Sequence, residues 1–192
     1  MWAMVENNNV IEIYTKPRFI KVNNVQYPFT IFTQYTKEEK KRIGIYDINL
    51  KKKSNSKFYN MSQPSYYFDK EAEVVNETFI IMERDLENEK TGLKFIYKKE
   101  CKQRAYAEIK RYGWLVERYI YDNTKEIPKE VTVYVEKVRL SCNRICKAID
   151  NSSNIDSFKT LFEDSYDKDG KVLEIAIIND WPDEINIRKY HR

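Results

Sequence analysis

The residues with the most distinctive chemistry in this chain are three cysteines, Cys101, Cys142 and Cys146. Cys142 and Cys146 are four residues apart, so they share one face if this stretch is helical. A structural zinc site normally has four ligands, and the only histidine, His191, lies near the C-terminus. Three cysteines also fit no disulfide framework. We therefore expect small buried apolar side chains in a reducing compartment, with no bound metal and no cofactor.

Other patterns that support catalysis are missing from the sequence. The chain has only four glycines, and none of them belongs to a nucleotide-binding fingerprint or a P-loop. No serine or cysteine nucleophile can be matched with a histidine in a folded element. Carboxylates are numerous, but their spacing singles out no pair for acid–base chemistry. We predict that the protein has no catalytic residues and is not an enzyme.

The charges of the chain are mixed in sign. Lysine and arginine number 34 against 30 aspartates and glutamates, which leaves a formal net charge of +4. The basic runs Lys37–Arg42 and Lys51–Lys53 are short and read as solvated surface. A dedicated nucleic-acid binder concentrates basic residues on one face, so this pattern does not favour nucleic acid as a partner. No run of about 18 apolar residues is present, and we expect no membrane span.

One aromatic residue and one cation are spaced so that they meet on a helix. Trp114 and Arg118 are four residues apart, and a guanidinium at this spacing can stack on the indole. Arg139, in the helix expected to face them, has three acidic candidates for an ion pair, and the sequence leaves the choice open. These candidates are Glu108, Glu117 and Glu136.

The C-terminal half has the periodicity of a helical hairpin. A helical pattern starts at Leu93, is interrupted near Gly113 and continues to Tyr121. Pro128 suits the first turn of the next helix, where a missing N–H costs nothing. That helix carries an apolar stripe, and residues 155–162 form a short third helix. The residues predicted to build the hairpin are Trp114, Arg118, Pro128, Tyr134, Val138, Arg139, Ile145 and Ile149.

The N-terminal half reads as short strands. Asn23 and Asn24 tolerate the left-handed conformation that a hairpin turn needs. Thr36 and Glu39 form a capping box for a short helix that ends before Gly44. The predicted strands cover residues 10–14, 19–22, 25–27, 45–50, 58–61, 65–68 and 73–83.

These patterns predict an α+β protein with a small antiparallel β domain, which contains one short helix, and a helical hairpin with a short third helix. The expected divisions are a β-rich domain over residues 1–84, a linker over 85–92, a helical domain over 93–163, and a C-terminal loop, strand and tail over 164–192.

Aromatic residues are the main candidates for an interaction surface. The chain has 15 tyrosines and nine phenylalanines, and many of them fall in short strands that one small core cannot absorb. Aromatic side chains at a surface are typical of protein–protein contacts. The predicted interface residues are Tyr27, Phe29, Phe32, Tyr35, Tyr46, Phe58, Tyr59, Tyr66, Tyr67, Phe68 and Trp181.

Several short motifs together resemble a family of small virion proteins of tailed bacteriophages, of the type found in marine phages. In the N-terminal half these are MWAMVE at 1–6, VNNVQYP at 22–28, IFT at 31–33 and GIY at 44–46. The C-terminal half resembles the helical module of phage tail-fibre assembly proteins. That resemblance is carried by Trp114, Arg118, Pro128, Tyr134, Arg139, Ala148, Ile149 and Trp181–Pro182, with departures at Gly113 and Val135.

The resemblance implies a non-enzymatic structural protein of the tail or neck region, made in the host cytoplasm and located in the virion. It would act as an adaptor for fibres or tail parts, with other virion proteins as partners and with its own copies in an oligomer or ring. One alternative is a tail-fibre assembly chaperone that is absent from the mature particle. Another is a small phage-encoded protein that binds nucleic acid or a host protein.

Overall fold

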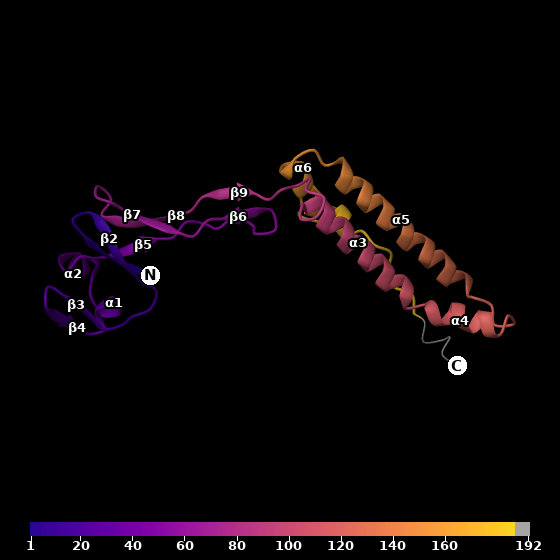
Figure 1. The fold of residues 1–192 in the computed structure, drawn as a ribbon, viewed down its shortest axis with the longest axis horizontal. Helices are drawn as coiled ribbons and strands as arrows, with labels where there is room; N and C mark the ends of the chain where they lie inside the picture. Colours follow the sequence, from indigo (N-terminus) through magenta and orange to yellow (C-terminus); the bar gives the residue numbers. More distant parts are fainter. Residues whose placement is uncertain (187–192) are drawn as a thin grey trace. The chain divides into compact units, whose positions relative to one another are not determined.

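The computed structural model describes residues 1–186, and it divides the chain into an N-terminal β unit (residues 1–82) and a C-terminal helical unit that begins at residue 83 (Figure 1). The α+β class predicted from the sequence is confirmed. No helix in the described part of the chain is both long and apolar enough to cross a bilayer. His191 lies outside the described residues.

The β unit is built on a five-stranded sheet. Its strands, in spatial order, are β2 (Asn9–Tyr14), β1 (Trp2–Glu6), β5 (Ile45–Asn49), β8 (Val74–Thr78) and β7 (Ser65–Asp69). The pairs are antiparallel except for β5 and β8, which run parallel, so the sheet is mixed where an antiparallel one was predicted. The outer strands β2 and β7 approach each other, and the sheet is therefore strongly curled.

Two asparagine pairs form the tight turns of this unit. Asn7 and Asn8 connect β1 to β2 with φ values of 50° and 64°, and Asn23 and Asn24 connect β3 (Ile20–Val22) to β4 (Val25–Tyr27) with 48° and 65°. The second turn was predicted and is confirmed. Strand β1 was not predicted, although the Asn7–Asn8 pair in front of β2 carries the same signal.

The sheet buries side chains on both faces, because successive residues of a strand point to opposite sides. One face, which includes Met4 and Ile45, packs with residues from the β3–β4 hairpin and from α1 (Ile31–Gln34). The other face is built from Ala3, Val5 and Val75 with partly buried aromatic residues around them. Two small cores therefore replace the single core assumed from the sequence.

Two short helices follow the β3–β4 hairpin, where one was predicted. The additional helix is α1, whose Phe32 and Ile31 are buried. The predicted helix is α2 (Lys37–Arg42), and the capping box between Thr36 and Glu39 is present. On α2, the buried Lys40 ammonium donates to Asp47 of β5 at 2.8 Å.

The long strand predicted over residues 73–83 is two strands, β8 and β9 (Ile81–Glu83). The β7–β8 ladder ends at the pair of Ser65 and Thr78, and Pro64 before it has no N–H to continue the ladder. Beyond this point the Ile80 N–H donates to the Ser62 hydroxyl at 2.9 Å, and β9 pairs with β6 (Tyr59–Met61).

The helical unit is a hairpin of α3 (Leu93–Lys110) and α5 (Lys129–Asn151), which lie side by side (Figure 1). Between them, α4 (Gly113–Tyr121) lies at the end of the hairpin where α5 begins. Pro128 was predicted in the first turn of this helix, and it lies one position earlier, as the N-cap of α5. The third helix is confirmed as α6 (Ile155–Lys159) with one 3-10 turn, η1 (Thr160–Phe162), after it.

The hairpin differs from the prediction in its first helix. Trp114 and Arg118 lie on α4, whereas the helix that packs along α5 is α3. The break falls at Tyr112, whose φ and ψ of −102° and 1° are not helical, and Gly113 is already the first residue of α4. Tyr112 is buried, so the chain turns there around an aromatic anchor.

The apolar stripe of α5 is confirmed: Val138, Ile145 and Ile149 are fully buried. Tyr134, which was predicted to build the hairpin, is also buried in this stripe. Because the stripe repeats every three to four residues, it keeps one side of the helix against its neighbours.

Residues 85–92, predicted as a linker, form an ordered turn at the start of α3. Leu86 is buried, and the Asp85 carbonyl accepts from the Leu93 N–H at 2.9 Å. A Cβ at Gly92 would lie 2.5 Å from the Asn88 nitrogen, so only glycine fits this turn.

The C-terminal segment contains β10 (Ser165–Tyr166), β11 (Val172–Glu174) and the 3-10 helix η2 (Ile177–Asn179). The strand predicted over 172–178 stops early because Ala176 is buried and its N–H donates to the Asp164 carboxylate at 2.7 Å.

Candidate functional site

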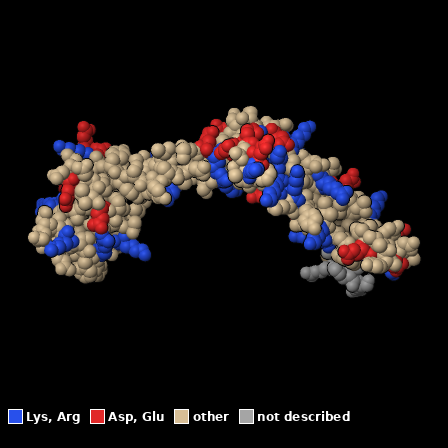
Figure 2. Space-filling model, viewed as in Figure 1, with Lys and Arg blue, Asp and Glu red and all other residues tan. Residues whose placement is uncertain are grey.

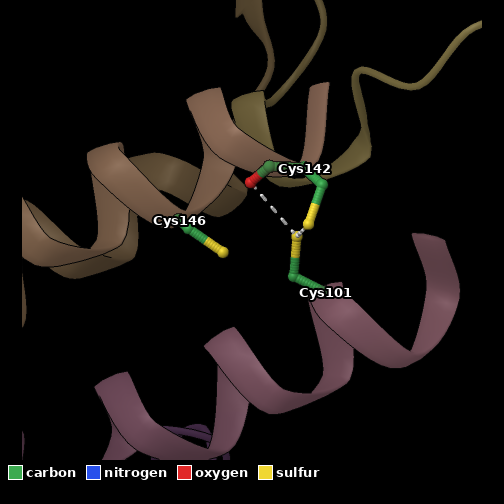
Figure 3. Close-up of side chains that lie close together, drawn as sticks. All are labelled: Cys101, Cys142 and Cys146. Carbon is green, nitrogen blue, oxygen red and sulfur yellow. Dashed lines mark hydrogen bonds between the residues drawn. The ribbon is translucent and has the colours of Figure 1, made fainter. Parts of the chain in front are cut away.

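The three cysteines come together in the helical unit. Cys101 lies on α3, and Cys142 and Cys146 lie one turn apart on α5. Their sulfur atoms all lie within 4.8 Å of one another, and those of Cys101 and Cys142 are 3.5 Å apart. Figure 3 shows the Cys101 side chain directed at α5 and the other two directed at α3. Within residues 1–186, these three cysteines are the group of potential metal ligands whose ligand atoms lie close enough together to share one ion.

Helical periodicity explains why the thiols meet. Cys142 belongs to the buried stripe of α5, and Cys101 and Ala105 belong to the buried face of α3, one turn apart. The expectation of small buried side chains is confirmed for Cys101 and Cys142, while Cys146 is partly exposed. Their proximity was not predicted. The available signal was that both helices place cysteine on the side that faces the other.

The surroundings of the cluster are mainly apolar. Burial raises the pKa of the Cys101 thiol, and the neighbouring thiols add to this effect. Burial also raises the pKa of Cys146, although the charge of Lys102 acts in the opposite direction. The Cys101 and Cys146 thiols are therefore protonated and weakly nucleophilic near neutral pH. This arrangement does not activate a catalytic cysteine, but it does present three sulfur ligands to one point.

The stacking predicted for Trp114 and Arg118 is confirmed, since the guanidinium carbon lies 5.3 Å from the centre of the indole ring. The ion pair predicted for Arg139 is absent from the described part of the chain. Arg139 is exposed. Glu108 instead pairs with Arg111 at 3.2 Å and accepts from the Tyr134 hydroxyl at 3.1 Å.

The predicted aromatic interface is only partly at the surface. Phe32 and Phe58 are buried, so their assignment to an interface was wrong. Four further residues pack against the two cores of the β unit, because the sheet buries both of its faces: Tyr27, Tyr46, Tyr66 and Phe68. Two more are partly buried, Tyr59 and Trp181, and Arg104 lies over the Trp181 ring. The exposed members of the predicted set are Phe29, Tyr35 and Tyr67.

A more continuous apolar surface lies on α4, where sequence analysis placed none. Val116, Tyr119, Ile120 and Tyr121 are 48%, 43%, 72% and 91% exposed, on a helix of nine residues. The first three recur at helical spacing and so form one strip, which we call the α4 surface together with Tyr121. The signal was present in this spacing, but the sequence analysis singled out only Trp114 and Arg118 on this stretch.

The helix α3 carries much of the positive charge. Six of its residues are basic and two are acidic, a net charge of +4. A shallow groove along it is lined by Phe95, Lys98, Lys99, Lys102, Gln103 and Tyr106. In the view of Figure 2, basic residues follow the hairpin, while acidic residues gather at the α6 end of the helical unit.

Fold and site together define a two-unit α+β protein whose helical hairpin encloses a thiol cluster. No protein-family model, curated protein or solved structure matches the chain.

Proposed function

We propose that the protein is a non-enzymatic structural component of a tailed-bacteriophage virion, an adaptor of the tail or neck region present in several copies. The family resemblance of the sequence supports the virion assignment. The observation in the molecule that carries the adaptor role is the α4 surface, because four large apolar side chains on one short helix are exposed to solvent.

Exposure of this kind is costly unless a partner covers it. Burying a side chain the size of valine or isoleucine stabilises by roughly 1.5–3 kcal/mol, so the α4 surface offers several kcal/mol to a protein contact. Contiguous exposed apolar surface on a soluble unit commonly marks an interaction site. Tyrosine is also enriched at the centres of protein interfaces, whereas charged residues lie mainly at the rim.

The partner proposed for the α4 surface is a second copy of the chain. A ring requires a heterologous contact, in which two different surfaces of one molecule fit each other. The helical unit has a second exposed apolar surface on and beside the β10–β11 hairpin, made of Tyr166, Leu173 and Ile175. A strip on one copy against this hairpin on the next satisfies the requirement, and repeated contacts close into a ring.

Two measurements test the proposal. Mass spectrometry of purified virions should find the protein in stoichiometric amounts, and its absence from mature particles would reject the virion role in favour of an assembly chaperone. Light scattering of the purified protein should show an oligomer. Ile120→Asp should convert it to monomer, whereas Glu117→Gln on the same helix should leave the oligomer unchanged. A wild-type protein that is monomeric at all concentrations removes the ring.

A second candidate function is nucleic-acid binding, favoured by the groove on α3. Three lysines of the groove lie between Phe95 and Tyr106, and single-stranded nucleic acid is bound by cations and stacking aromatics together. Lys98 is already paired with Asp150 at 2.6 Å, which leaves Lys99 and Lys102 as the main cations. Fluorescence anisotropy with a labelled oligonucleotide tests this function. Binding that weakens as the salt concentration rises, and that weakens in the Lys99→Gln/Lys102→Gln double variant, supports nucleic-acid binding. No binding at low salt removes it.

A further inference from the structure

We propose that Cys101, Cys142 and Cys146 form a metal site that binds one Zn²⁺ ion through three thiolates. This inference is independent of the virion role. It starts from the convergence of three sulfur atoms from two helices that are adjacent in space. The closest two sulfurs belong to Cys101 and Cys142, which are 41 residues apart in sequence.

The distances fit a shared ion. Zinc–sulfur bonds of about 2.3 Å place the sulfurs of a tetrahedral site about 3.8 Å apart. The Cys101 and Cys142 sulfurs are 3.5 Å apart, and every pair in the cluster is within 4.8 Å. Rotations about the Cα–Cβ bonds change sulfur positions by more than these differences, so the helices themselves need not move.

The chemistry of the ligands selects the class of ion. Sulfur ligands favour zinc and softer ions over magnesium or calcium. Among the described residues no imidazole or carboxylate joins the three sulfurs. Cys146 is partly exposed, so water can reach the remaining position of a tetrahedral ion from its side.

Charge balance favours a divalent ion over a monovalent one. Binding replaces the three S–H protons, which pass to solvent, and three thiolates with Zn²⁺ carry a net charge of −1. The same thiolates with Cu⁺ carry −2, which is more costly in a buried site. Lys102, next to Cys101 on α3, is the basic residue beside the cluster in sequence.

A bound ion would link α3 to α5 in the middle of the hairpin. Because a preformed ligand set of this kind does not exist in the unfolded chain, binding stabilises the folded state. The cluster then has a structural use that three separate small apolar residues would not provide.

The test uses the full-length reduced protein, freed of metal and titrated with Zn²⁺ against a chromogenic competitor. We expect one ion per chain. Cys101→Ala, Cys142→Ala and Cys146→Ala should each weaken binding at least as much as loss of an outer-sphere partner does, roughly 10- to 100-fold. Ser141→Ala, next to Cys142, is the matched control and should bind as the wild type does.

Two further measurements use the wild-type protein and therefore do not depend on whether the alanine variants fold. In the wild type, X-ray absorption should count three sulfurs around the ion, at about 2.3 Å. Zinc should also protect all three thiols from alkylation and raise the melting temperature. Four outcomes would overturn the proposal: no zinc binding, binding of Cu⁺ but not Zn²⁺, two sulfurs around the ion in place of three, or alanine variants that bind zinc as tightly as the wild type does.

Discussion

Tyr134 gives the sharpest test of how the hairpin is held together. Its ring is buried in the stripe of α5, 5.3 Å from the Tyr112 ring in an edge-on arrangement. Its hydroxyl donates to the Glu108 carboxylate of α3 at 3.1 Å. Tyr134→Phe keeps the ring and removes only this one of the hydrogen bonds that join α3 to α5.

The expected cost follows from the remaining partners of Glu108. A hydrogen bond to a charged group contributes about 1.5–3 kcal/mol. Glu108 keeps its ion pair with Arg111 at 3.2 Å, and its side chain is 19% exposed, so water can replace part of the loss. We therefore expect Tyr134→Phe to lower the free energy of unfolding by about 1.5 kcal/mol, the lower end of that range.

The pH dependence has a definite sign. Burial and the hydrogen bond to Glu108 raise the pKa of Tyr134 above its ordinary value. The wild-type advantage over Tyr134→Phe should therefore be complete below about pH 10, where the tyrosine of the unfolded chain is also protonated. It should decrease as the pH rises above 10, because folding must then keep a proton that the unfolded chain releases.

The assay is urea unfolding followed by tryptophan fluorescence. Trp114 and Trp181 report on the helical unit, and Trp2→Phe removes the signal of the β unit so that the two units are not confused. Tyr106→Phe, at an exposed site on α3, is the control and should change stability by less than about 0.5 kcal/mol. A Tyr134→Phe effect as small as that of the control, or one independent of pH above 10, would refute the reasoning.

Three further predictions concern single side chains. Ile145→Ala opens a cavity in the fully buried stripe of α5 and should cost about 2–5 kcal/mol in urea unfolding. Asp47→Ala leaves the buried Lys40 ammonium without its carboxylate and should cost about 1–3 kcal/mol, an effect that Lys40→Met should largely avoid. Asn24→Val puts a β-branched residue at a φ of 65° and should lower the melting temperature of the β unit, whereas Asn24→Gly should not.

Local signals in the sequence were sufficient for much of the fold. The capping box at Thr36, the turn at Asn23–Asn24 and the start of α5 after Pro128 depend on a few neighbouring residues, and the structure has all three. The buried stripe of α5 follows from helical spacing alone. These features require no knowledge of what packs against them.

The predictions that were wrong concern features that depend on contacts between segments far apart in the sequence. The parallel pairing of β5 with β8 brings Asn49 next to Asn76, 27 residues later, and it is not encoded in either strand alone. Phe32 looks like an interface residue until α1 is placed against the sheet. An interruption near Gly113 was predicted, but Trp114 was assigned to the hairpin because nothing local shows that α3 alone packs along α5.

The cysteines illustrate why one stripe can have two roles, and how to separate them. Cys101 and Cys142 occupy positions where small side chains let α3 and α5 come close, so any replacement tests packing and metal binding together. A serine replacement would add a buried hydroxyl without a hydrogen-bond partner, which costs about 1–3 kcal/mol. The free energy of unfolding would then fall even if the thiols bind no metal. Alanine removes the sulfur and leaves no polar group behind. If packing is the only role, each alanine variant loses the same stability with and without zinc; if the thiols hold an ion, the loss is larger with zinc present.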